Sequence, residues 1–191
     1  MSVASLVLAL SLAILAWSAF AADPGWQEGR GTWFDVQDGD LRTANCHFRW
    51  DQVRTGKYIG AFSDTNPMFR GSCGKCIELR CQNADFKDGF GQTLDRKNAC
   101  KDPKRSIFVT IADACPCHYP SNHHSNKRWC CGDSSRTHID VTQEAFAQLA
   151  DLGHGVIALQ WRLVDCKTVS SGTGHYYPSG SSSSPSKWTS L

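Results

Sequence analysis

The chain has 191 residues, ten cysteines and a formal net charge of +2. This length fits one folded domain. The small net charge, with lysine and arginine scattered along the chain, gives no sign of a nucleic-acid-binding surface and permits only weak attraction to acidic polymers. An even number of cysteines is typical of an exported protein whose cysteines are all paired.

The first 21 residues are predicted to be an export signal. Residues 6–16 form an apolar run, and Ala19 and Ala21 place small side chains where signal peptidase cleaves. The run lacks the usual preceding Lys or Arg, and it is shorter than the roughly 20 residues that a membrane span needs. The alternative, a buried N-terminal helix, would show a polar face. We therefore expect a secreted, extracellular protein, monomeric and free of the membrane once the signal has been removed.

Strand-like stretches dominate the next part of the chain. They are rich in β-branched and aromatic residues and alternate with Gly, Asn and Pro turns, at residues 31–36, 57–62, 77–80, 106–112 and 156–164. One helix is predicted from residue 142, because Thr142 can cap it, an apolar stripe follows at helical spacing, and Gly153 can end it. The pattern predicts a mainly β, compact barrel over residues 26–166. The Ser- and Gly-rich residues 167–191 are typical of a disordered tail.

Two carboxylates stand at the ends of predicted elements. Asp113 ends a strand beside a Cys-Pro turn, and Asp140 stands just before the predicted helix. Cleavage of a glycosidic bond uses one protonated and one ionised carboxyl group held in this way. Each also has a structural alternative. Asp140 can cap the helix, with Gln143 completing a capping box, and Asp113 can accept backbone hydrogen bonds in the turn.

Four segments, in this order, carry a family resemblance. They are Thr-Trp-Phe at residues 32–34, Cys-Gly-Lys-Cys-Ile-Glu-Leu-Arg-Cys at 73–81, His-Ile-Asp at 138–140 and Val-Asp-Cys at 164–166. They resemble Thr-Trp-Tyr, Cys-Gly-x-Cys-Tyr-Glu-x-x-Cys, His-Phe-Asp and the closing Val-x-Cys of the first domain of expansins. That domain is related to glycoside hydrolase family 45 endoglucanases. The resemblance covers residues 26–166 and implies a six-stranded double-psi β-barrel with one or two short helices, stabilised by disulfides.

The resemblance also implies roles for individual residues. Asp140 corresponds to the catalytic acid of the related hydrolases, and Asp113 is expected close to it in a groove. Trp33 has an alternative role as a core aromatic, and Phe34 stands where the family usually has Tyr, so one polar contact is missing. The residues expected to bind substrate are Thr32, Trp33, Phe34 and His138.

The second carboxylate decides between an enzyme and a non-enzyme. The hydrolases place their base two residues after the aromatic at Phe34, where this chain has Val36. Asp35 is one residue away, and such an offset in a strand turns a side chain to the opposite face. A strand that ends at Phe34 would free Asp35 to turn inward, which makes it the candidate base. Asp38 and Asp40 are weaker candidates.

The resemblance implies a pairing for the cysteines: Cys46–Cys73, Cys76–Cys166, Cys81–Cys100, Cys115–Cys130 and, as the remaining bridge, Cys117–Cys131. An exchange within the last four stays open. The rival interpretation is a zinc site made by these four cysteines and three nearby histidines, His118, His123 and His124. Bridging is favoured in an exported chain, so no metal and no cofactor are expected. The His-rich insert 117–131 is expected to be a surface loop, or alternatively a gate to the groove.

Three functions compete. The leading hypothesis is an expansin-like protein that binds and loosens cell-wall polysaccharide, cellulose or another β-glucan, without hydrolysis. The second is an inverting endo-β-1,4-glucanase with Asp140 as acid and Asp35 as base, or a transglycosylase-like enzyme that uses Asp140 alone. The third is a barwin- or natriuretic-like binding or signalling module. Expansins also carry a second, cellulose-binding domain; residues 167–191 are too few for one, so weaker affinity is expected.

Overall fold

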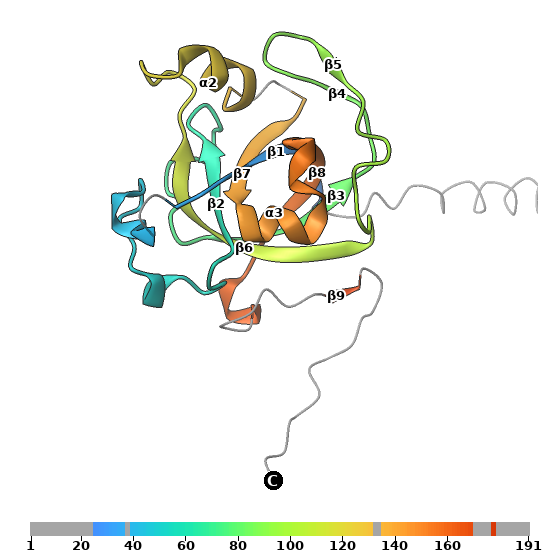
Figure 1. The fold of residues 1–191 in the computed structure, drawn as a ribbon. Helices are drawn as coiled ribbons and strands as arrows, with labels where there is room; N and C mark the ends of the chain where they lie inside the picture. The colour runs from blue at the N-terminus through green and yellow to red at the C-terminus, as the bar shows by residue number, and fades with distance from the viewer. Residues whose placement is uncertain (1–24, 37–38, 132–134, 170–176, 179–191) are drawn as a thin grey trace, which may run out of the picture.

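The structure is a computed structural model that describes residues 25–36, 39–131, 135–169 and 177–178 (Figure 1). The predicted export signal, Asp38 and most of the predicted tail lie outside these residues. Among the described helices, none has the length and apolar character needed to cross a membrane.

Six strands form a closed barrel. They are β1 (Gln27–Phe34), β2 (Ile59–Ser63), β3 (Cys76–Gln82), β6 (Arg105–Cys115), β7 (Thr137–Thr142) and β8 (Val156–Val164). Their order is β2-β7-β1-β8-β3-β6, and pairing between β2 and β6 closes the circle. The pairs β1–β7 and β2–β6 are parallel, and the others are antiparallel. The mainly β, six-stranded barrel predicted from the sequence is confirmed.

The remaining elements surround this barrel. The helices are α2 (His123–Trp129) and α3 (Gln143–Leu149), and the short 3-10 turns are Leu41–Thr43, Trp50–Gln52, Leu152–His154 and Cys166–Thr168. Strands β4 (Phe86–Lys87) and β5 (Thr93–Leu94) pair with each other, and β9 (Tyr177–Pro178) adds to the edge of β6. In Figure 1, α2 and the β4–β5 segment stand at the same end of the barrel, and α3 lies beside β6.

Alternate side chains of the strands fill the interior. Ile139 and Val141 of β7 are buried in the main core cluster, together with Leu159 of β8. Gly31 of β1 faces the same way, and a Cβ there would lie 2.5 Å from Cδ1 of Leu159 and 2.7 Å from the carbonyl oxygen of Ile139. Only glycine fits at this crossing. The residues between these positions on β1 and β7, which include Thr32, therefore face away from the core cluster.

The segment before α3 corrects one prediction. Residues 137–142 form a full strand of the barrel, because the β-branched side chains at 137, 139, 141 and 142 suit a pleated, half-buried surface. Asp140 therefore lies within a strand and does not cap the helix. Thr142 occupies the N-cap position, but its hydroxyl donates to the carbonyl of Lys57 at 2.7 Å. The helix ends at Leu149, ahead of Gly153, because Ala150 turns extended and pairs with Cys100.

All ten cysteines are paired, and the predicted pairing is confirmed. The bridges are Cys46–Cys73, Cys76–Cys166, Cys81–Cys100, Cys115–Cys130 and Cys117–Cys131. The zinc interpretation of the last four cysteines is wrong, since their sulfurs are bonded to one another. Within the described part of the chain, no group of three or more potential metal ligands comes together. The insert 117–131 is also more than a loop, because its second half is α2.

Candidate functional site

A row of side chains crosses four neighbouring strands on the face turned away from the core. Ala61 of β2 pairs with Asp113 of β6 on one side and with Asp140 of β7 on the other. Residues directly opposite in adjacent strands point to the same face, so both carboxyl groups lie on it, with their Cα atoms about 10 Å apart. The register of β1 on β7 continues the row to Thr32. Ala61, buried against Phe34 and the Cys115–Cys130 bridge, lies between the two acids.

A β-bulge places Asp113 in this row. Gly60 pairs with Ile111, whereas Ala61 pairs with Asp113, so Ala112 is the extra residue on β6. A bulge of this kind re-aims the side chains that follow it. With regular pairing, Ala112 would face Ala61, and Asp113 would point into the barrel. The proximity of Asp113 to Asp140, expected from the resemblance, therefore has a local backbone cause.

Asp140 is held as a weak acid. Burial, the largest cause, and the charge of Asp113 raise its pKa from 3.8 to about 7, although hydrogen bonds from Thr32 and the Val141 N–H act to lower it. Part of the residue still reaches the surface, where it lines a hollow. Asp140 therefore presents a proton to that hollow at mildly acidic pH.

His138 is linked to Asp140 through the Thr32 hydroxyl. It is fully buried, and burial, followed by the charge of Arg30, lowers its pKa from 6.5 to about 3, so the ring is neutral. The Thr32 hydroxyl donates to Oδ1 of Asp140 at 2.9 Å and lies 3.2 Å from Nε2 of His138. Because the hydroxyl proton is used on Asp140, its oxygen accepts from the His138 N–H. Nδ1 of His138 has no hydrogen-bond partner among the described residues.

The hollow at Asp140 has two tryptophan walls. Its volume is 330 Å³, and it is lined by Thr32, Trp33, Ser125, Asn126, Trp129, Cys130, Asp140 and Gly155. Trp33 packs in part against the core, and its Nε1 donates to the carbonyl of Leu152 at 3.1 Å. It thus serves both as core aromatic and as wall. Trp129 carries the Arg128 guanidinium 4.5 Å from its ring centre.

Three of the lining residues come from α2 and were not predicted from the sequence. Ser125, Asn126 and Trp129 lie in a seven-residue helix with no buried residue. Its N-cap, Asn122, makes no side-chain cap hydrogen bond. The helix therefore lacks both the apolar stripe and the capping signal by which helices are predicted. Trp129 beside the paired Cys130 was the only available hint.

Asp35 lies in a different hollow from Asp140. Strand β1 ends at Phe34, and Asp35, which is exposed, lines a space of 180 Å³ together with Phe34 and Asp113. Oδ1 of Asp113 accepts hydrogen bonds of 2.8 Å from the backbone N–H groups of Asn45 and Ala114. The turn-stabilising role expected as the alternative for Asp113 is thus present. The weaker candidate, Asp40, pairs with Arg42 at 2.8 Å.

Fold and site together define a small disulfide-bonded β-barrel with a largely buried carboxyl group, that of Asp140, on its outer face. A family model described as DPBB_1, lytic transglycolase, matches residues 58–161, more than half of the chain. The chain therefore belongs to this double-psi β-barrel family. The predicted resemblance to expansins is confirmed by the curated relatives of the chain.

Those relatives are plant expansins. The chain is 26% identical over 153 residues to Expansin-A32 and 28% identical over 160 residues to Expansin-B16, both of Oryza sativa subsp. japonica. It is 25% identical over 148 residues to Expansin-A24 of Arabidopsis thaliana. These alignments cover 78%, 76% and 76% of this chain but 51%, 47% and 41% of the relatives. The chain thus spans about half the length of the curated relatives it matches.

Among solved structures, the chain aligns with an expansin and a cerato-platanin. The apo expansin of Clavibacter michiganensis aligns with a TM-score of 0.44 at 19% identity, over 73% of this chain and 50% of that one. A mutant of the same expansin in complex with cellohexaose gives 0.44 at 18% identity over the same shares. Cerato-platanin 3 of M. perniciosa gives 0.41 at 17% identity, over 74% of this chain and 98% of that one.

Proposed function

We propose that the protein is a secreted, expansin-like protein of the cell wall that binds a β-glucan strand and loosens its contacts without hydrolysis. The observation that carries the proposal is Asp140, a carboxyl group with a pKa of about 7 in a hollow between Trp33 and Trp129. No second carboxyl group lines that hollow among the described residues. The expansin relatives support the same reading.

The geometry suggests how loosening would work. The flat apolar faces of Trp33 and Trp129 suit the faces of sugar rings, whereas Asp140 and Thr32 supply hydrogen bonds that fix the orientation. A protonated Asp140 donates a hydrogen bond to a glucan hydroxyl that would otherwise bond to a neighbouring strand. Asp113, two strands away, extends the polar contacts along the same face. His138, fully buried, acts as a positioning residue through Thr32.

A wall-extension assay tests the proposal. Wild-type protein is expected to extend heat-inactivated cell walls or weaken filter paper with no rise in reducing ends. Asp140→Ala removes the hydrogen-bond donor, which an Asn amide would keep, and is expected to reduce the effect about fivefold or more, as for the loss of about 1 kcal/mol. Asp151→Ala, at a side chain that is 78% exposed, is the matched control and should keep full activity. Soluble sugars that appear in proportion to the loosening would refute the proposal.

One observation favours a second candidate, a glycoside hydrolase. Strand β1 ends at Phe34, so Asp35 is not held in the sheet. Asp35 lines the same hollow as Asp113. In that case Asp35→Ala would abolish the release of reducing ends from a soluble β-glucan, and Asp140→Asn would do the same. A transglycosylase-like use of Asp140 alone would instead leave anhydro-sugar ends and tolerate Asp35→Ala. A wild-type protein that releases nothing between pH 4 and pH 8 excludes both.

A further inference from the structure

Helix α2 separates two hollows. Ser125, Asn126 and Trp129 line the hollow at Asp140, whereas His123 and Lys127, one turn apart on another side of the helix, line a second cavity of 470 Å³. This cavity is larger than the one at Asp140 and shares none of its lining residues. It belongs to a separate place on the barrel, and the proposed glucan site makes no use of it.

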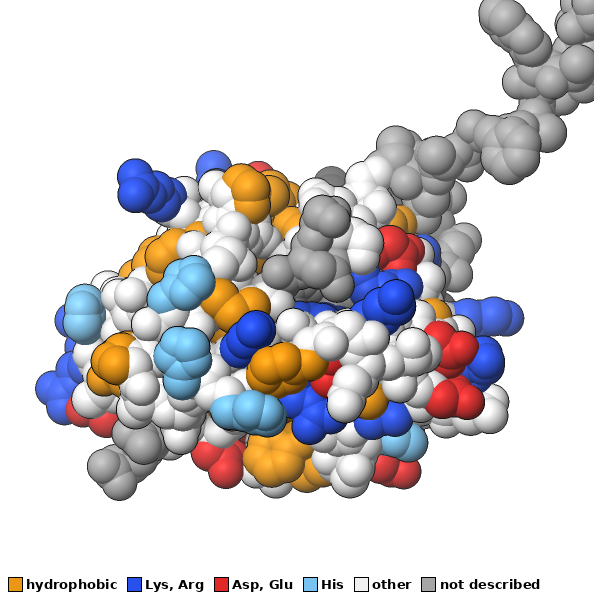
Figure 2. All heavy atoms as spheres, turned by 90° about the horizontal axis from the view of Figure 1, so that it is seen from above, with side chains coloured by type: hydrophobic (Ala, Val, Ile, Leu, Met, Phe, Trp, Pro, Cys, Tyr) orange, Lys and Arg blue, Asp and Glu red, His pale blue; other side chains and the backbone are white. Residues whose placement is uncertain are grey.

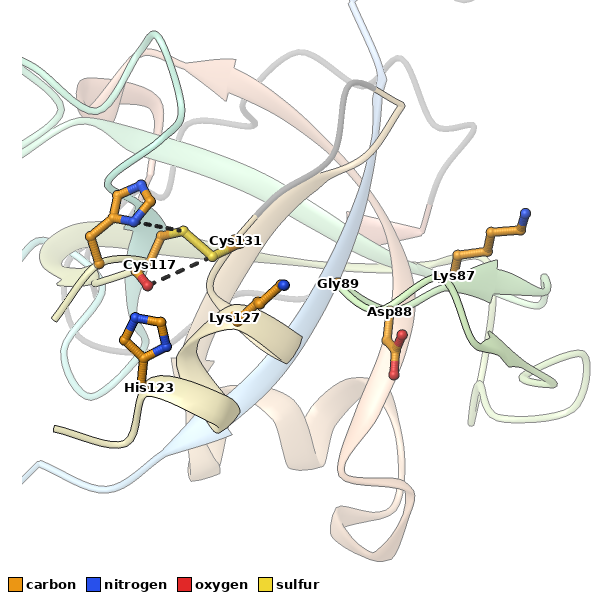
Figure 3. Close-up of a pocket in the computed structure, with 9 residues that line it drawn as sticks. Lys87, Asp88, Gly89, Cys117, His123, Lys127 and Cys131 are labelled. Carbon is orange, nitrogen blue, oxygen red and sulfur yellow. Dashed lines mark hydrogen bonds between the residues drawn. A yellow bond between two sulfur atoms is a disulfide. The ribbon is translucent and has the colours of Figure 1, made fainter. Parts of the chain in front are cut away.

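The second cavity lies between α2, the Cys117–Cys131 bridge and the turn after β4 (Figure 3). In that view Lys127 extends between the disulfide and Gly89, and the Lys87 side chain runs away from them. The residues that line it are Lys87, Asp88, Gly89, Gly91, Cys117, His118, His123, Lys127 and Cys131. Figure 2 looks onto this end of the barrel and shows histidine side chains beside lysine or arginine and hydrophobic ones.

The walls of this cavity are fixed to each other. The buried Arg30 guanidinium donates to the carbonyl of Lys87 on one wall and to that of Cys131 on the other. The N–H of Gly89 donates to the carbonyl of Arg128 at 2.9 Å, and a Cβ at Gly89 would lie 1.9 Å from the carbonyl oxygen of Lys127. Glycine thus allows the β4 turn to touch the helix backbone. The cavity is preorganised, which lowers the entropic cost of binding.

The charged groups that line the cavity favour an anion. Its one acidic residue, Asp88, is buried, and its carboxylate is already satisfied by Arg128 at 2.8 Å and by the N–H groups of Phe90 and Gln92. Burial alone would raise the pKa of Asp88, but these hydrogen bonds together lower it, so the carboxylate stays ionised and paired. The other titratable side chains that face the cavity are basic: His118, His123 and Lys127; Lys87 lines it too, but its ammonium group points away.

The cavity also offers apolar surface for the body of a ligand. The Cys117–Cys131 bridge and the methylene groups of Lys127 supply this surface, and the Phe90 ring, 42% exposed, lies beside the Lys127 ammonium at 5.1 Å. Phe90 in turn stacks on His124 with ring centres 4.7 Å apart. An ammonium group next to flat apolar surfaces suits a ring that carries a carboxylate.

We infer that this cavity is a second carbohydrate site, which binds a uronic-acid residue of an acidic polysaccharide. Lys127 pairs with the carboxylate, His118 and His123 donate further hydrogen bonds, and the disulfide wall contacts the face of the sugar ring. The inference does not depend on the glucan proposal, because the two sites share only the helix between them. A wall protein with both sites would hold a neutral and an acidic polymer at once.

Titration calorimetry with oligogalacturonic acid of three or four residues tests the inference. The free acid is expected to bind, and the methyl-esterified oligomer of equal length, which has the same rings without charge, is expected to bind at least fivefold more weakly. Lys127→Gln should weaken binding of the free acid by a similar factor, whereas Lys127→Arg keeps the charge and should retain most of it. Raising the salt from 20 to 300 mM should weaken wild-type binding, as for a half-enclosed ion pair.

The controls separate the two sites. Lys75→Gln removes an exposed charge that lines neither hollow and should leave uronate binding unchanged. Trp33→Ala should weaken binding of a cello-oligosaccharide and leave uronate binding intact, so failure of the glucan proposal would be recognised separately. Equal affinity for acid and ester, or wild-type affinity in Lys127→Gln, would overturn the inference.

Discussion

At the scale of single residues, two ionisable groups of the site affect the pH dependence of stability in opposite directions. Asp140 keeps a proton in the folded state up to about pH 7, which an unfolded chain with a pKa of 3.8 has already released. His138 stays neutral down to about pH 3, whereas an unfolded chain takes up a proton below pH 6.5. As the pH rises from 4 to 6.5, the first group lowers the free energy of unfolding and the second raises it. The two effects oppose each other in that window.

In the Asp140→Asn variant, the free energy of unfolding should therefore depend on pH through His138 without the opposing effect of Asp140. Relative to wild type, the free energy of unfolding of this variant should increase with pH between 4 and 7, by at most about 1.4 kcal/mol per pH unit. His138→Gln should change in the opposite direction between pH 3 and 6.5, relative to wild type. Urea unfolding with the disulfides intact measures both. Parallel pH profiles for the two variants and wild type would contradict the assignment.

The Thr32 hydroxyl lowers the pKa of Asp140, because it donates to the ionised carboxylate. Thr32→Val keeps the shape of the side chain and is expected to raise that pKa further, at a cost of about 1 kcal/mol in stability. Asp113→Asn should have the opposite effect on the same pKa, because it removes a negative charge that opposes ionisation. Titration of the Asp140 carboxyl carbon by NMR gives both directions. Shifts of the same sign would show that other contacts set the value.

At the scale of elements, packing decides what local patterns leave open. Five strands were predictable from β-branched and aromatic runs, and the helix start from Thr142. Strand β7 was missed because Asp140 and His138 interrupt an otherwise β-branched run. The bulge at Ala112 leaves no mark in the sequence at all, since only the pairing with β2 defines it. The acid could be named from a motif, but its neighbours on α2 could not.

The crossing of β1 and β7 leaves no room for a side chain at Gly31. Gly31→Ala would push a methyl group against Leu159 and the Ile139 carbonyl, so it should destabilise the protein by about 1–3 kcal/mol and move Thr32 off Asp140. Urea unfolding and the wall-extension assay should both respond. Gly153→Ala, where a Cβ meets nothing within 4 Å, should stay within about 0.5 kcal/mol of wild type. Equal free energies of unfolding for the two variants would mean that β1 and β7 can move apart without loss of stability, which would contradict the prediction.

At the scale of the whole molecule, the disulfides divide into long and short closures. Cys76–Cys166 spans 90 residues and joins the start of β3 to the chain just beyond β8, whereas Cys117–Cys131 spans 14 and closes only the α2 segment. Loop-closure entropy in the unfolded chain grows with the logarithm of the loop length. The long bridge is therefore expected to contribute more to global stability, and the short one to shape the cavity it lines.

Replacing both cysteines of a bridge by serine separates these roles. Loss of Cys76–Cys166 should cost about 4–5 kcal/mol and loss of Cys117–Cys131 about 3 kcal/mol, measured by urea unfolding. Only the second change should weaken uronate binding, because only that bridge forms a wall of the cavity. Equal losses of stability would mean that the folded-state contacts of each bridge outweigh its effect on the unfolded chain.

The row from Asp113 through Ala61 and Asp140 to Thr32 draws one side chain from each of four strands, and those strands come from opposite ends of the barrel sequence. A ligand lying along the row would contact all four strands at once. It would therefore bind the folded barrel, in which the strands lie side by side, and not the unfolded chain, in which they are apart. Its binding should therefore raise the melting temperature of the whole domain in proportion to the logarithm of its concentration. A thermal-shift screen of wall oligosaccharides would then reveal the natural ligand without any assay of activity.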